Sequence, residues 1–294
     1  LGRHLMANWQ IGDVKITRVV EVEAALPGGG AGSMVEKAFP DAVKEIGWLR
    51  PHFANDEGHI RVAIQALLIE TPAMRIIVDT CVGNDKERAN PFFNNLQTAF
   101  LKDMEKAGWT RDSVDTVLCT HLHVDHVGWN TMLVDGKWVP TFPKARYLIG
   151  RREWEHWSNE NDADNAPVLG DSVQPIFDAG LADLIDETHR LCPEVSVRPT
   201  PGHTPGHISV VISSKGESAV ITGDLMHHPC QMARLDWRSA FDTDGDAAEK
   251  TRHAFLAEMA DSDTLVIGTH FATPAAGHIR RDGDAYRLDV GKAG

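Results

Sequence analysis

The chain has 294 residues, a formal net charge of −13 and a hydrophobic content of 42%. This acidic balance argues against binding to nucleic acid or anionic membranes through net charge, and no run of about 18 apolar residues could span a bilayer. The length fits one large domain or two fused halves with a substantial core. The four cysteines are scattered without a C-x-x-C pair, which favours reduced thiols in a cytoplasmic protein.

The first ten residues, LGRHLMANWQ, contain no charged region followed by an apolar run. We therefore expect no secretory signal in this sequence. Residues 1–5 are interpreted as vector-derived, within an N-terminal extension that covers residues 1–12. Residues 13–294 are expected to form a single domain.

Short β-branched runs predict strands that alternate loosely with helices along the chain. The predicted strands cover residues 13–23, 62–70, 75–80, 114–120, 145–150, 195–200, 208–213, 218–224 and 264–270. The predicted helices cover residues 34–46, 95–107, 151–157, 172–186 and 247–260. Because some strands follow each other directly, this order favours an α/β chain in which helices cover sheets that include hairpins.

A histidine or an aspartate stands at or just past the end of several predicted strands. The residues in these positions are Asp79, His121, His203, Asp224 and His270. In open α/β sheets, ligands bind outside the carboxyl ends of the strands. Side chains from different strands can therefore converge on one place.

The stretch THLHVDHVG, residues 120–128, adds His123, Asp125 and His126 to the first of these histidines. Four such groups on one short loop would crowd and repel each other if they only faced solvent, so metal binding is the leading interpretation. A pair of divalent ions needs several nitrogen ligands, carboxylate oxygen and usually a bridge. Together with the later strand-end residues, this loop supplies five histidines and two aspartates.

The order H-x-H-x-D-H at 121–126, then His203 after a glycine, Gly-Asp at 223–224 and a late His270 resembles the metallo-β-lactamase superfamily. The resemblance covers roughly residues 60–278. It implies a four-layer αβ/βα sandwich of two mixed β-sheets flanked by helices. It also implies a metal pair at the rim between the sheets.

Carried over by position, the resemblance implies that Asp224 bridges two metal ions. The first ion would be bound by His121, His123 and His203, and the second by Asp125, His126 and His270. Two Zn²⁺ ions per chain suit these ligands, and iron or manganese can also use them. Asp79 would accept a hydrogen bond from a ligand histidine; a strand-end turn is its alternative role.

In this family a hydroxide that bridges the two metals attacks the substrate. Asp125 is expected to pass a proton to the leaving group, so Asp125 and Asp224 are the predicted catalytic residues. The bridging aspartate disfavours true zinc β-lactamases, and His123 in place of a glutamate disfavours the flavo-diiron branch. The predicted function is therefore the cleavage of a lactone or carboxylic ester in an uncharged, fairly hydrophobic small molecule. The alternatives are phosphotriester hydrolysis, weak β-lactamase activity and an iron-dependent redox reaction.

Two segments, about 24–60 and 129–190, are expected to shape the substrate pocket. Phe93, Trp129 and Phe271 are its candidate lining residues because they flank the motifs. His227 and His228 are interpreted as surface residues or as residues behind the ligands, with substrate contact as the alternative. The Asp-rich run 242–250 is interpreted as a helix cap. A small-molecule substrate is the expected partner, without nucleic acid or membrane, and a homodimer is left open.

Overall fold

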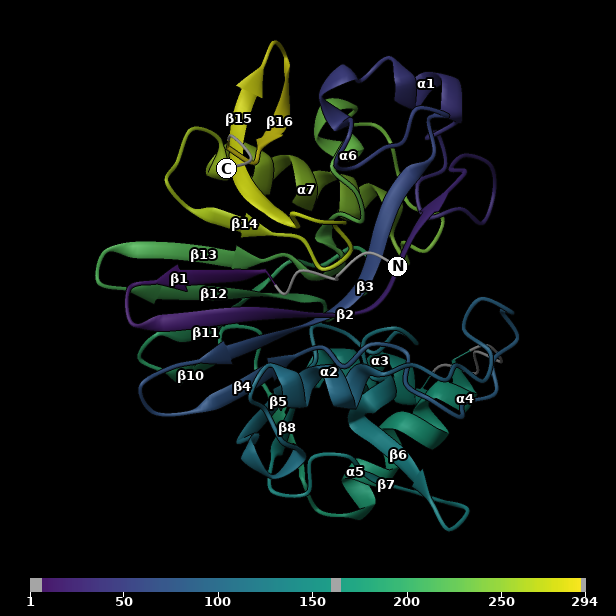
Figure 1. Ribbon diagram of the computed structural model, residues 1–294, viewed down its shortest axis with the longest axis vertical. Helices are drawn as coiled ribbons and strands as arrows, with labels where there is room; N and C mark the ends of the chain where they lie inside the picture. Colours follow the sequence, from purple (N-terminus) through teal and green to yellow (C-terminus); the bar gives the residue numbers. More distant parts are fainter. Residues whose placement is uncertain (1–6, 160–164, 292–294) are drawn as a thin grey trace.

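The computed structural model describes residues 7–159 and 165–291, and within these ranges two seven-stranded mixed sheets form the centre of the molecule (Figure 1). The first sheet consists, in spatial order, of β1 (Asn8–Ile11), β2 (Val14–Leu26), β3 (Ile60–Glu70), β4 (Arg75–Val78), β5 (Thr116–Leu118), β8 (Arg146–Gly150) and β9 (Ala182–Ile185). The second consists of β10 (Arg190–Cys192), β11 (Val195–Pro199), β12 (Ile208–Ser214), β13 (Glu217–Ile221), β14 (Leu265–Ile267), β15 (Ala276–Asp282) and β16 (Ala285–Asp289). A separate hairpin joins β6 (Thr131–Val134) and β7 (Lys137–Pro140).

Helices cover the outer faces of both sheets. They are α1 (Pro40–Lys44), α2 (Phe100–Lys106), α3 (Arg151–Asn159), α4 (Ala166–Val168), α5 (Gln174–Asp178), α6 (Cys230–Ala233) and α7 (Gly245–Met259). Figure 1 shows α6 and α7 on one side of the sheets and α2, α3 and α5 on the other. Among the described residues, no helix has both the length and the apolar character needed to cross a membrane. The two sheets with helices on their outer faces form the predicted four-layer sandwich.

Strands of both sheets are buried on both faces, which explains their nearly continuous apolar sequences. In β3, Leu67 and Ile69 belong to the core between the sheets, whereas Ala66 and Leu68 pack toward the helices. The same alternation occurs in β13, where Ile221 faces the other sheet and Val220 packs beneath α7. Period-two alternation therefore builds three apolar layers between the four layers of secondary structure.

Each predicted strand overlaps an observed one, and the predicted helix 247–260 corresponds to α7. The single helix predicted over 172–186 is wrong, because α5 is followed by Gly180 at φ +69° and then by β9, which pairs with β8. The helix predicted over 34–46 shortens to α1, which begins at Pro40.

The N-terminal extension predicted over residues 1–12 is only partly described, since residues 1–5 lie outside the described residues. Residues 8–11 form β1, which pairs with β2 at the edge of the first sheet. Ile11 is 5% exposed and lies in the core between the sheets. This part of the expected extension therefore belongs to the folded core.

The loop after β5 packs directly on the segment after β4. The backbone N–H groups of Thr80 and Gly128 donate to His126 O and Cys81 O, both at 2.7 Å. A Cβ atom added to Gly128 would lie 1.8 Å from the carbonyl oxygen of Val82. Only glycine lets these two backbones approach so closely.

We predict that Gly128→Ala lowers the free energy of unfolding by about 3 kcal/mol, because backbone cannot move aside as a flexible side chain can. Gly47→Ala is the matched control, since a Cβ atom at this exposed glycine meets no heavy atom within 4 Å. Urea denaturation followed by circular dichroism measures both. Equal stability of the two variants would contradict this account of the loop.

Candidate functional site

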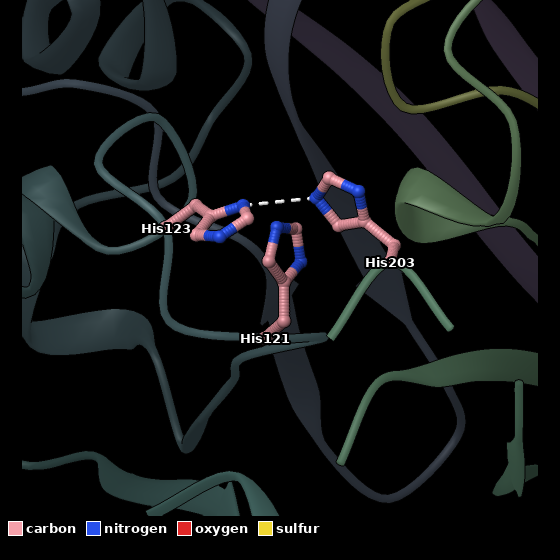
Figure 2. A group of neighbouring side chains, drawn as sticks. All are labelled: His121, His123 and His203. Atoms are coloured by element: carbon pink, nitrogen blue, oxygen red, sulfur yellow. Dashed lines mark hydrogen bonds between the residues drawn. The ribbon is translucent and has the colours of Figure 1, made fainter. Parts of the chain in front are cut away.

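Three histidines from two loops form the first ligand group. His121 and His123 lie on the loop after β5, and His203 lies on the loop after β11. One ligand atom from each lies within 4.8 Å of the others. Figure 2 shows the three rings directed toward a common point, with His123 Nδ1 2.9 Å from His203 Nε2. The two loops belong to different sheets, so this group stands at the seam between them.

Asp125, His126 and His270 form a second group by the same measure. The Nε2 atoms of His126 and His270 lie 3.6 Å from Asp125 Oδ1 and Oδ2, respectively. His270 follows β14 in the second sheet, whereas the other two residues share the loop after β5. This group therefore also spans both sheets.

Asp224, which follows β13, lies between the two groups. Its Oδ1 lies 3.3 Å from His126 Nε2, and its Oδ2 lies 3.3 Å from His203 Nε2 and 3.8 Å from His121 Nε2. His270 Nε2 lies 3.2 Å from both oxygens, so the carboxylate contacts histidines of both groups. The structure brings together all seven residues that the sequence pattern indicated as ligands, with the aspartate in the position expected of a bridge.

The donor atoms fit divalent metal. Among the described residues, the buried atoms His121 Nε2 and Asp224 Oδ1 have no hydrogen-bond partner. This is a costly state for polar atoms unless another ligand satisfies them. Burial lowers the pKa of His121 and His203 well below its ordinary value, and that of His123 to about 4, so these rings are neutral and each has one nitrogen lone pair. Neutral imidazole and carboxylate are ligands that zinc prefers.

The second group attracts positive charge. Burial lowers the pKa of His126, but Asp224, Asp125 and Asp79 outweigh it and raise the pKa well above the ordinary value. For Asp224, burial by itself raises the pKa, yet the surrounding histidines outweigh burial and hold the pKa well below its usual range. A cation at this place is therefore electrostatically favoured.

Acceptors behind the ligands fix the direction of the imidazoles. Asp79 Oδ2 lies 2.9 Å from His126 Nδ1, which is the contact expected for Asp79, and its Oδ1 accepts from the backbone N–H of Thr120. His270 Nδ1 lies 2.8 Å from the carbonyl oxygen of Ala63. These bonds leave each Nε2 free to face the centre.

The sequence did not reveal Asp242, whose Oδ1 lies 3.0 Å from His203 Nδ1. The run that contains it was interpreted as a helix cap, and Asp244 does cap α7 by accepting from the N–H of Ala247. Asp242, two residues earlier, does not cap the helix and instead contacts His203. The interpretation as a helix cap is confirmed for Asp244, but spacing alone does not show that Asp242 turns toward His203.

His227 and His207 also belong to the site. His227 is 2% exposed, and its Nε2 lies 3.3 Å from Asp224 Oδ2. That nitrogen has no hydrogen-bond partner among residues 7–159 and 165–291. His207 Nε2 accepts the backbone N–H of Asp224 at 2.8 Å. Burial lowers the pKa of His207 to about 3, so it remains a neutral acceptor. In the sequence, the only indication that His227 belongs to the site is its position three residues after Asp224.

A cavity of about 470 Å³ opens onto this centre, with His123, Asp125, His203, Asp224, His227 and His270 in its lining. The other lining groups include Met34, Phe93, Trp157, Val168 and Phe241. A neighbouring cavity of about 280 Å³ shares Met34, Asn90, Phe93, Asp125 and Phe241 with it. Both expected pocket-shaping segments contribute, as do two others, near Phe93 and Phe241.

Of the three aromatic residues expected at the pocket, Phe93 lines it, whereas Trp129 and Phe271 lie in the core. Trp129 stacks on Phe100 and donates its indole N–H to Glu21 at 2.7 Å. Phe271 is fully buried and packs edge-on against Phe53. A residue next to a ligand in sequence can point away from it, which the motif pattern does not reveal.

A buried ion network supports one wall of the cavity. The two terminal guanidinium nitrogens of Arg88 donate to Asp171, at 2.7 and 2.8 Å. Lys86 Nζ lies 3.5 Å from the same carboxylate and 3.8 Å from the centre of the Trp138 ring. Burial lowers the pKa of Lys86 to about 8. The network joins the loop that bears Phe93 to the turn that follows α4.

We predict that Asp242→Asn weakens the binding of zinc by about 10–100-fold, because His203 loses the acceptor that orients it. Asp244→Asn is the control, since asparagine caps a helix about as well as aspartate. Competition with a chelator measures both affinities. If the two variants bound zinc equally well, the role of Asp242 would be wrong.

Comparison with known proteins supports this reading of the site. Residues 59–270 match the family described as Metallo-beta-lactamase superfamily. The "Probable metallo-hydrolase Rv2300c" of Mycobacterium tuberculosis is 25% identical over 235 residues, which cover 72% of this chain and 71% of the relative. An "N-acyl homoserine lactonase" of a Bacillus species is 23% identical over 166 residues, 52% of this chain and 60% of the relative.

Solved structures agree in fold. The crystal structure of "hydrolase AbOPH in beta lactamase superfamily" has a TM-score of 0.78 and 26% identity, and the match covers 98% of both chains. The structure of AidC, described as a dizinc quorum-quenching lactonase in complex with a product, has a TM-score of 0.77 and 23% identity over 98% of this chain and 97% of that one. The family match spans most of the chain and both ligand groups, and the chain therefore belongs to the metallo-β-lactamase superfamily.

Proposed function

We propose that this metal-dependent hydrolase uses two zinc ions to open a lactone or cleave a carboxylic ester in an uncharged, fairly hydrophobic small molecule. The observation that carries the proposal is the position of Asp224 between two ligand groups at the floor of a largely apolar cavity. Cavities of this size accommodate drug-sized ligands, and apolar walls favour uncharged ones. The relatives named as lactonases support the same choice.

His121, His123 and His203 would hold one ion, Asp125, His126 and His270 the other, and Asp224 both. When bound, such a pair supplies Lewis acidity and an activated water at neutral pH. Asp79 and Asp242 keep the imidazoles in place from behind, so the ligand atoms need little reorganisation during the reaction.

Two side chains of the cavity are placed to act on the substrate. Asp125 lines both cavities and is only half-buried, so its carboxylate can carry a proton to the leaving oxygen. His227 lines the larger cavity, and among the described residues its Nε2 has no hydrogen-bond partner, so its ring is placed to donate an N–H to the substrate oxygen. Tyr147 cannot serve this purpose, since its hydroxyl is buried against Phe142 N and Asn130 O.

The first test is hydrolysis by the zinc-loaded protein of acyl-homoserine lactones, simple lactones, aryl esters, a phosphotriester and a cephalosporin. We expect lactones or esters to be the best substrates by kcat/KM. Asp224→Ala should lower this activity by more than about 100-fold, because a lost ligand costs more than a lost acceptor behind one. A best rate on the phosphotriester or the cephalosporin would overturn the substrate class.

A second prediction concerns His227→Ala. We expect kcat to fall by about 100-fold with the zinc content unchanged, which is the usual cost of removing one oxyanion donor. His228→Ala is the matched control: the neighbouring ring is buried against the carbonyl oxygen of Phe53 and is absent from the cavity lining. An unchanged kcat in His227→Ala would exclude the assigned role.

A further inference from the structure

We infer that Glu153 is a positioning residue of the metal centre, which holds the two loops that carry His121, His123 and His203 at their working separation. Glu153 lies on α3, outside all the sequence motifs of the site, and is 1% exposed. The inference rests on the metal centre that the proposed function uses, but it concerns metal binding rather than the substrate.

Each carboxylate oxygen of Glu153 accepts a backbone N–H from a different ligand loop. Oε1 lies 3.1 Å from the nitrogen of Leu122, the residue between His121 and His123. Oε2 lies 3.1 Å from the nitrogen of Gly206, three residues after His203. The first loop follows a strand of the first sheet and the second precedes a strand of the other sheet. One carboxylate therefore joins the two sheets beside the first ligand group.

A third donor links the same carboxylate to a ligand ring. The indole N–H of Trp157, one turn later on α3, donates to Glu153 Oε1 at 2.7 Å. The Trp157 ring packs against His123 with centroids 5.3 Å apart and planes at 63°. Trp157 also lines the cavity. Glu153 thus fixes both the backbone beside His123 and the aromatic surface against its ring.

The contact between α3 and the His203 loop leaves no space for adjustment. A Cβ atom added to Gly206 would lie 2.2 Å from the backbone nitrogen of Glu153. Burial raises the pKa of Glu153, while its N–H partners oppose that shift. Since His123 Nδ1 and His203 Nε2 are only 2.9 Å apart across the seam, a small displacement of either loop would separate two ligands of one ion.

Glu21 offers a matched control. Its partly buried carboxylate also accepts a backbone N–H, from Val82 at 2.8 Å, and an indole N–H, from Trp129 at 2.7 Å. Its donors do not include a backbone N–H from the His203 loop. Replacing either glutamate by glutamine is expected to lower the folding stability by a similar amount. The amide has one acceptor oxygen, so its NH₂ group must face an N–H donor that the carboxylate accepted.

The experiment measures stepwise Zn²⁺ affinities by chelator competition, and the absorption spectrum of the Co²⁺ form, for wild type, Glu153→Gln and Glu21→Gln. We expect Glu153→Gln to weaken one of the two binding steps by about 10–100-fold, to leave the other step near wild type and to alter the Co²⁺ spectrum. Glu21→Gln should keep both affinities and the spectrum. Thermal unfolding of the metal-free proteins measures the stability loss that both variants share.

Wild-type affinity at both steps in Glu153→Gln, or equal weakening in the two variants, would overturn the inference. Glu153→Asp covers the case in which the amide variant does not fold: the shorter carboxylate retains its charge but cannot reach both loops, so the same selective loss is expected. Because ester hydrolysis is not the readout, failure on the substrate panel would refute the proposed function and leave this result standing.

Discussion

The site depends on one electrostatic constraint, the burial of the Asp224 carboxylate among imidazoles at the seam between two sheets. Its Oδ1 faces His126 and its Oδ2 faces His203, and within the described part of the chain Oδ1 has no hydrogen-bond partner. A buried carboxylate is costly unless charge and donors surround it. Histidines delivered by strands of both sheets supply that environment, and the same environment favours divalent cations.

The residues around the two groups fix the orientation of the candidate ligands. Asp79 and Asp242 face the outer nitrogens of His126 and His203, and the carbonyl of Ala63 faces that of His270. His207 holds the backbone of Asp224 itself. Preorganisation of this kind is typical of sites whose chemistry depends on fixed dipoles. For the same reason, we expect residues outside the motifs to affect metal binding.

The walls of the cavity are built from loops and short helices rather than from strand ends. They come from segments far apart in sequence, among them the loop near Phe93, α3 at Trp157, α4 at Val168 and the turn at Phe241. The buried network of Lys86, Arg88 and Asp171 joins two of these segments. Such loops can vary while the strand ends stay fixed, which is how one fold serves many substrates.

The sequence by itself determined most of the strands and indicated the candidate ligands. Close spacing on one loop and the position of polar residues after apolar runs are local signals, and they single out His121, His123, Asp125, His126, His203, Asp224 and His270. The metal-binding role of each residue is what the resemblance to the family implies. Only the tertiary structure decided which way side chains point. Trp129 and Phe271 turn into the core, and His227 turns into the cavity. Asp242 and Glu153 bond to the ligand loops from behind. Packing between layers selects these orientations, and no local pattern encodes them.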